Sequence, residues 1–209
     1  KHLNTAAALI AEVDVDATFA ATARRDASIR PNMIESPECD LAGARHPVLD
    51  RLLGAEFVPI DVKLGGSEPG LALVTGPNMA GKSTAIRTAA LLTLLAHAGA
   101  YVPAASATIG RCDRILTRIG ASDELHAGRS TFMVEMTETA SILHAATPHS
   151  LVVLDEIGRG TSTLDGLALA WSIAEHLADL GVRTLFATHY HELTDLANTR
   201  SGVKNLHVL

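Results

Sequence analysis

Three short apolar runs stand out along the chain, at residues 71–75, 151–154 and 184–188. None of them alternates between apolar and polar positions. Unbroken apolar runs of this length are typical of strands buried on both faces of a parallel sheet. Residues 115–119 form a fourth candidate strand.

Helical spacing of apolar residues separates these runs. It predicts helices over 85–98, 131–146 and 167–180, the last ended by Gly181. A further helical pattern covers 3–23, and Pro31 and Pro37 interrupt any helix beyond it. Because strands and helices alternate, the sequence predicts an α/β fold with a mostly parallel sheet flanked by helices.

Residues 41–64 carry a different, strand-like pattern. Ile60, Val62 and Leu64 alternate with Asp61 and Lys63, as in a strand with one exposed face. We therefore expect a small antiparallel β portion here. Residues 65–70, 99–111 and 158–166 are rich in turn formers and are predicted to be loops.

Composition narrows the possible functions. The 209 residues carry a formal net charge of −6, which argues against a dedicated DNA-binding surface in this segment. Cys39 and Cys112 have no metal-ligand spacing, so we expect buried thiols in a reducing compartment. No apolar stretch is long enough to span a bilayer. Since the first residue is Lys1, we expect a piece of a longer protein.

Residues 76–84 contain the strongest chemical signal, the pattern G-x-x-x-x-G-K-[ST] of a phosphate-binding loop. Gly76 and Gly81 allow a tight turn and a close approach of the backbone to an anion. The loop N–H groups and the start of the next helix would surround phosphates. Lys82 would reach the β- and γ-phosphates, and Ser83 would offer a hydroxyl to Mg²⁺.

Two acids and a histidine follow predicted strands. Asp155 is placed to hold Mg²⁺, and Glu156 to polarise a water molecule. The alternative is a pair of helix-capping acids. His189 ends another strand, where it is either a contact to the γ-phosphate or water or a structural side chain. Parallel sheets bind ligands at the carboxyl ends of their strands, so we expect these residues to meet the loop there.

Two further features remain open from the residues alone. Ser130 and Thr131 precede a predicted helix, whose N-terminus is either an anion site or a simple serine cap. Phe57 is either a stacking platform for adenine or a core side chain.

The sequence resembles the ATPase domain of the MutS family of DNA mismatch-recognition proteins. The resemblance extends from about residue 40 to residue 207. Its motifs lie at 75–84, 128–136, 154–163 and 186–193, with a lead-in at 45–48 and 57–59. One departure is Ile60, where the family usually has Asn.

The resemblance implies a P-loop NTPase of the ABC type, binding ATP or ADP with Mg²⁺. Residues 31–209 would form the ATPase domain, and 1–30 the end of the family's core and lever helices. The implied nucleotide contacts are Phe57, Gly76, Pro77, Asn78, Met79, Ala80, Gly81, Lys82, Ser83 and Thr84.

The resemblance also implies roles around the phosphates. Ser83 and Asp155 would hold the metal, and Glu156, His189 and Lys82 would be catalytic. Ser130 and Thr131 would contact the nucleotide of a second copy of the chain, and Asp165 would lie in the loop facing the opposed site.

The implied function is ATP hydrolysis by a dimerising module, coupled in the whole protein to mismatched DNA, clamp movement and a repair partner such as MutL. A bacterial cytosolic, nucleoid-associated location without membrane contact would follow. Three alternatives remain: a MutS-like paralogue, another ABC-type DNA repair ATPase, and a nucleotide-gated dimerisation module with incidental turnover. No Ser-Gly-Gly signature typical of the chromosome-maintenance ATPases is found, and paralogues usually lack the form at 158–163.

Overall fold

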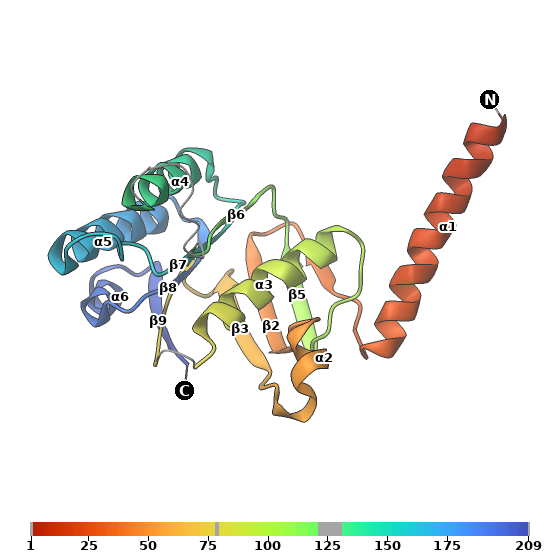
Figure 1. Ribbon diagram of the computed structural model, residues 1–209, viewed down its shortest axis with the longest axis horizontal. Helices are drawn as coiled ribbons and strands as arrows, with labels where there is room; N and C mark the ends of the chain where they lie inside the picture. Colours follow the sequence, from red (N-terminus) through yellow and green to blue (C-terminus); the bar gives the residue numbers. More distant parts are fainter. Residues whose placement is uncertain (1, 78–79, 121–130, 209) are drawn as a thin grey trace.

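Two β-sheets pack against each other in the computed structural model, which describes residues 2–77, 80–120 and 131–208 (Figure 1). The larger sheet has five strands in the order β6-β7-β8-β4-β9, and all neighbouring pairs are parallel. Its strands are β4 (Leu71–Thr75), β6 (Ile115–Arg118), β7 (Leu151–Asp155), β8 (Arg183–Ala187) and β9 (Val203–His207). The predicted parallel sheet is therefore confirmed.

Burial on both faces explains why the central strands read as unbroken apolar runs. In β4, Ala72 and Val74 join the core on one face of the sheet, whereas Leu71 and Leu73 join the core on the other. Every residue of β4, β7 and β8 is buried. Successive side chains of a strand point to opposite faces of the sheet. When both faces are covered, the side chains on each face are therefore mostly apolar.

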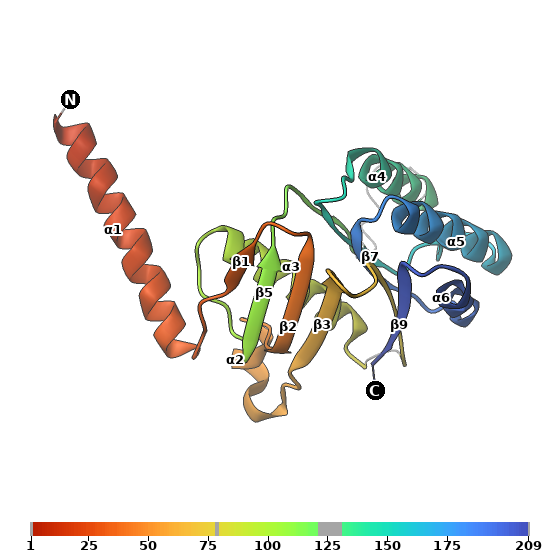
Figure 2. The same cartoon turned by 180° about the vertical axis from the view of Figure 1, so that it is seen from behind.

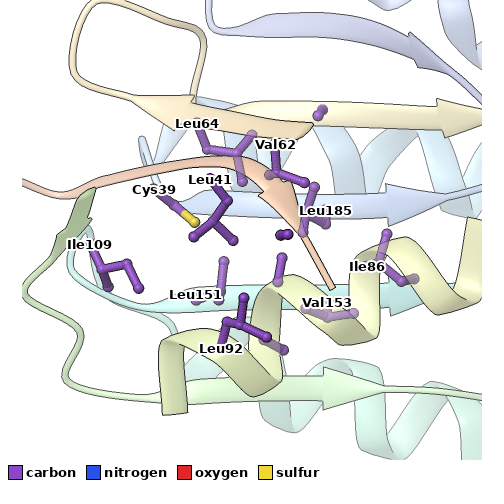
Figure 3. Packing of buried hydrophobic residues seen from close by; sticks show 14 of the residues in the cluster. Cys39, Leu41, Val62, Leu64, Ile86, Leu92, Ile109, Leu151, Val153 and Leu185 are labelled. Atoms are coloured by element: carbon purple, nitrogen blue, oxygen red, sulfur yellow. The ribbon is translucent and has the colours of Figure 1, made fainter. Parts of the chain in front are cut away.

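Helices cover the large sheet unevenly. One face packs against α3 (Lys82–His97) together with the smaller sheet, and Figure 3 shows the side chains of this shared core, including Leu41, Ile86 and Leu185. The other face packs against the remaining C-terminal helices. They are α4 (Thr131–Ala145), α5 (Thr163–Asp179), the 3-10 helix η2 (His191–Asp195) and α6 (Leu196–Thr199).

The smaller sheet differs in part from the prediction. Its strands, in the order β1-β5-β2-β3, are β1 (Asn32–Ile34), β5 (Ser106–Gly110), β2 (Glu38–Ala44) and β3 (Ile60–Gly65). The pairs β2·β3 and β2·β5 are antiparallel, but β1 pairs with β5 in parallel, so the sheet is mixed. Residues 99–111, predicted as loop, contain β5. Residues 41–64 contain a helical segment, α2 (Leu49–Leu53) and η1 (Gly54–Glu56), that alternation did not reveal.

The first helix, α1 (His2–Arg25), projects away from both sheets, as Figures 1 and 2 show from opposite sides. None of its residues is buried. The helix predicted from the apolar spacing over 3–23 is confirmed. The domain division at residue 30 stays a prediction. In the part of the chain that the structure describes, no helix combines the length and apolarity needed to cross a membrane.

Candidate active site

The carboxyl ends of three neighbouring strands bring the predicted site together. Strand β8 lies between β4 and β7, and its Ala187 is in register with Val74 on one side and Asp155 on the other. The Gly-rich loop follows β4, the acid pair ends β7, and His189 follows β8. The prediction that these residues gather at one edge of the sheet is confirmed.

The loop after β4 needs glycine at its first position. Gly76 has φ +143°, and a Cβ there would lie 2.3 Å from the carbonyl oxygen of Val208. No other residue fits that approach. Asn78 and Met79 lie outside the described residues.

Helix α3 begins at the loop with its N-terminus uncapped by any side chain. The N-cap is Gly81, at φ +92°. The first N–H groups of a helix have no partner within the helix, so this end attracts anions. Lys82 is 5% exposed, and its Nζ donates to the carbonyl oxygens of Gly76 at 2.7 Å and Pro77 at 3.1 Å.

A cavity of about 340 Å³ lies between this helix start and the loop after β7. It is lined by Pro77, Gly81, Lys82, Ser83, Thr84, Glu156 and Arg159. Donors and a hydroxyl therefore face it from one side, and an acid and a second cation face it from the other.

Asp155 is a buried carboxylate with one oxygen left over. Its side chain is 6% exposed, and Oδ2 lies 3.3 Å from Nη2 of Arg87. Oδ1 is buried without a hydrogen-bond partner. A buried polar atom without a partner is unfavourable, and this oxygen has the chemistry of a magnesium ligand. Among residues 2–77, 80–120 and 131–208, no group of three or more His, Cys, Asp or Glu side chains forms a metal cage. Mg²⁺ usually takes one or two carboxylates and completes its shell with water and phosphate oxygens.

Glu156 adopts a strained backbone conformation. Its φ is +56°, a left-handed value that costs a non-glycine residue on the order of 1 kcal/mol. Its N–H donates to the carbonyl oxygen of Ala187 at 2.9 Å, and its carboxylate pairs with Arg159 at 2.8 Å. Capping is not its role, because α5 begins at Thr163 and Ser162 is the N-cap. The alternative of a helix-capping acid pair is therefore wrong.

His189 is exposed beside these charges. Partial burial and the positive charges of Arg159 and Lys82 lower its pKa below the ordinary value, against the opposing charges of Glu156 and Glu192. The imidazole is thus neutral at pH 7. Its ring centroid lies 4.0 Å from that of Tyr190.

The other predicted contacts lie elsewhere. Phe57 is 6% exposed, with the guanidinium of Arg45 5.2 Å from its ring centroid. Thr131 is the exposed first residue of α4 and is not among the residues that line the cavity. Ser130 lies outside the described residues, so its predicted role stays a prediction. Asp165 is exposed and, with Ser162, forms a reciprocal cap at the start of α5.

Sequence reasoning missed four side chains around the site. Arg87 reaches Asp155 across 68 residues of sequence, and Arg159 contacts Glu156 within the turn. Glu135 and Tyr190 contact the backbone of the same turn. Arg159, Glu135 and Tyr190 lie within the motif ranges 154–163, 128–136 and 186–193, but nothing in their spacing indicates these contacts, and Arg87 lies outside those ranges.

Comparison with known proteins gives consistent matches. Residues 72–209 match the protein family MutS domain V. The DNA mismatch repair protein MutS of Myxococcus xanthus is 56% identical over 209 residues, covering 98% of this chain and 23% of that protein. The MutS proteins of Syntrophobacter fumaroxidans and Solibacter usitatus are each 54% identical, covering 99% and 100% of this chain and 24% of each protein. The chain spans about a quarter of the length of these curated relatives. It therefore belongs to the MutS family and carries domain V of that family.

Proposed function

We propose that the chain is a P-loop ATPase module of the ABC type that binds ATP with Mg²⁺ and hydrolyses it. The observation that carries this proposal is the cavity between the start of α3 and the loop after β7, with Lys82 and Ser83 on one side and Glu156 on the other. A phosphate chain needs cations and N–H donors, and its hydrolysis needs an acceptor for the attacking water. Both kinds of group face this one space.

The phosphate-binding half is the loop and the first turn of α3. Lys82 would exchange its two carbonyl acceptors for phosphate oxygens, which bind an ammonium more strongly because they are charged. The uncapped N–H groups at Gly81 add donors whose position is fixed by the helix. Positioning of this kind supplies most of the catalysis in phosphoryl transfer.

The hydrolytic half is the turn after β7. Ser83 and the free Oδ1 of Asp155 would hold the ion, and bound Mg²⁺ would neutralise charge on the phosphate oxygens. Glu156 would orient and polarise a water molecule. Arg159 holds the Glu156 carboxylate in place through their ion pair. Neutral His189 would contribute a hydrogen bond rather than a charge.

The same reasoning extends to partners. A second copy of the chain would complete each site through Ser130 and Thr131, as the resemblance implies. Since the relatives are named DNA mismatch repair proteins, coupling of nucleotide state to mismatched DNA and to a repair partner such as MutL is proposed for the longer protein.

Replacement of Glu156 by Gln tests the proposal. ATP affinity should stay within about threefold of wild type, while turnover falls by about 100-fold or more, because the amide keeps the shape but loses the base. Glu175→Gln, which alters the ion pair between Glu175 on α5 and Arg200 after α6, should change neither quantity.

Both quantities are measured by equilibrium binding of labelled ATP and by phosphate release at several chain concentrations. Turnover per chain should rise with concentration if two copies complete the site. Unchanged turnover in Glu156→Gln would remove this residue from its role, and a wild-type chain that binds no ATP would refute the function.

A further inference from the structure

Two buried side chains form hydrogen bonds with the backbone of the turn after β7, beside the proposed hydrolytic centre. Glu135, on α4, accepts the N–H of Gly158 through Oε1 at 2.6 Å. Tyr190 donates its hydroxyl to the carbonyl oxygen of the same glycine at 3.0 Å. Glu135 is 6% exposed and Tyr190 is 4% exposed. A single residue is therefore held by buried side chains through both its N–H and its C=O.

Packing leaves no room for a side chain at Gly158. Its φ is +92°, and a Cβ there would lie 2.8 Å from the backbone of Gly166. A Cβ on Gly166 would in turn lie 2.1 Å from the Tyr190 hydroxyl. The turn after β7 and the start of α5 thus meet through backbone atoms, and the Tyr190 hydroxyl, from the segment after β8, packs against both.

The residues next to these contacts are the ones proposed to act on the phosphates. Gly158 lies between Glu156 and its ion-pair partner Arg159. Tyr190 directly follows His189, and their rings are in contact. The left-handed conformation of Glu156 persists only if the surrounding structure fixes it. The bond from its own N–H to Ala187 anchors one side of the residue, and Gly158 is the anchor on the other.

Helix α4 joins the same contact. The helix begins at Thr131, one turn before Glu135. A Cβ on Gly160 would lie 3.0 Å from the Cβ of Phe132 in that first turn. A displacement at the start of α4 would therefore reach the turn that carries Glu156 and Arg159 through two contacts.

We propose that Glu135 and Tyr190 are positioning residues that clamp the Gly158 backbone and so hold Glu156 and His189 in register with each other. The inference rests on the proposed hydrolysis and names the residues that keep its geometry. A charge-assisted acceptor such as a carboxylate binds a backbone N–H more tightly than a neutral one. The acceptor oxygen is essential to the clamp, and the negative charge strengthens it.

The test compares Glu135→Ala, Glu135→Gln and Tyr190→Phe with the wild-type chain. In Glu135→Ala, turnover should fall about tenfold or more while the Kd for ATP stays within about threefold, because the phosphate loop is untouched. Glu135→Gln keeps a carbonyl oxygen in the same place and should recover most of the turnover. Tyr190→Phe, which removes only a hydroxyl, should slow turnover at unchanged Kd. The matched control is Glu138→Ala on the same helix, where the carboxylate is 53% exposed and pairs with Arg118.

Amide hydrogen exchange gives a readout that does not depend on activity. The Gly158 amide should exchange at least tenfold faster in Glu135→Ala, while the Thr188 amide, bonded to the carbonyl oxygen of Val74, should not change. Equal exchange at Gly158, or a Kd that rises as much as turnover falls, would overturn the inference. So would wild-type turnover in both Glu135→Ala and Tyr190→Phe. A wild-type chain without turnover would instead overturn the proposed function, and the exchange result would still report whether Glu135 holds Gly158.

Discussion

The two ends of the parallel sheet each bury a charge, and they treat it in opposite ways. At the amino end, Arg183 is 1% exposed and both of its terminal amino groups are bonded to backbone carbonyls. At the carboxyl end, Asp155 is 6% exposed and keeps one oxygen without a partner. The first arrangement is nearly complete: among the described residues, only Nε of this guanidinium lacks a hydrogen-bond partner.

The difference separates a structural charge from the charge proposed to bind the metal. The carbonyls that Arg183 binds belong to Glu38 and Gly110 of the mixed sheet and to Arg111 and His149 in connecting segments. The side chain thus ties the mixed sheet to the parallel sheet. Asp155 is next to Glu156, which lines the cavity, and its unmet bonding capacity is what a ligand would satisfy.

Replacing Arg183 by Met removes the link between the two sheets at the amino ends of the strands and should have the largest effect on stability. Four carbonyl oxygens lose their donor, and a neutral side chain cannot replace it, so the free energy of unfolding should fall by about 3 kcal/mol. ATP affinity per folded molecule should not change, because the site is at the other end of the strands.

Urea denaturation measures this change. Arg111→Met is the matched control, because that side chain is 69% exposed, and it should change the free energy of unfolding by less than about 0.5 kcal/mol. Equal stability of the two variants would show that Arg183 does not join the sheets.

A smaller effect on stability should come from the protonation of His189, at the carboxyl ends of the strands. The pKa of His189 lies below the ordinary value of about 6.5, so the unfolded chain takes up this proton at a higher pH than the folded chain. Stability from this group is therefore present above about pH 6.5 and is lost as pH falls through the folded pKa. Because the side chain is exposed, the change in stability should be slight.

Turnover should depend on the protonation of His189 more strongly than stability does. It should be level from pH 7.5 to about 6.5 and then fall a few-fold as His189 becomes charged. The His189→Asn variant should not show this fall in turnover at low pH, whereas His176→Asn, in the last turn of α5, should still show it. If the pH profile of His189→Asn matched that of the wild-type chain, the fall in turnover at low pH would belong to another group.

The two sheets also differ in how well the sequence predicts them. Strands β4, β7 and β8 are buried on both faces, so their apolar runs are visible without any knowledge of their neighbours. Strand β1 has only 3 residues, and its pairing with β5 joins Asn32 to Thr108 across a long separation in the chain. Strand β9, where Lys204 and Asn205 interrupt the apolar residues, gave no signal. Those elements exist because of partners that local pattern does not reveal.

The site divides in the same way. Lys82, Ser83, Asp155 and Glu156 are fixed by local motifs at strand ends, and parallel pairing brings them together. Arg87, Glu135 and Tyr190 act through contacts between distant segments and show no spacing of their own. A sequence reading therefore finds the groups that would touch a ligand and misses those that hold them.

The most direct test asks whether the loop after β4 and the acid at the end of β7 share one metal–nucleotide site. Mn²⁺ replaces Mg²⁺ in the presence of a non-hydrolysable ATP analogue, and amide signals of the ¹⁵N-labelled chain are recorded. The account predicts that paramagnetic broadening depends on the nucleotide and is stronger at both Ser83 and Asp155 than at Arg183. Broadening at Ser83 without matching broadening at Asp155, or broadening that is the same without nucleotide, would contradict it.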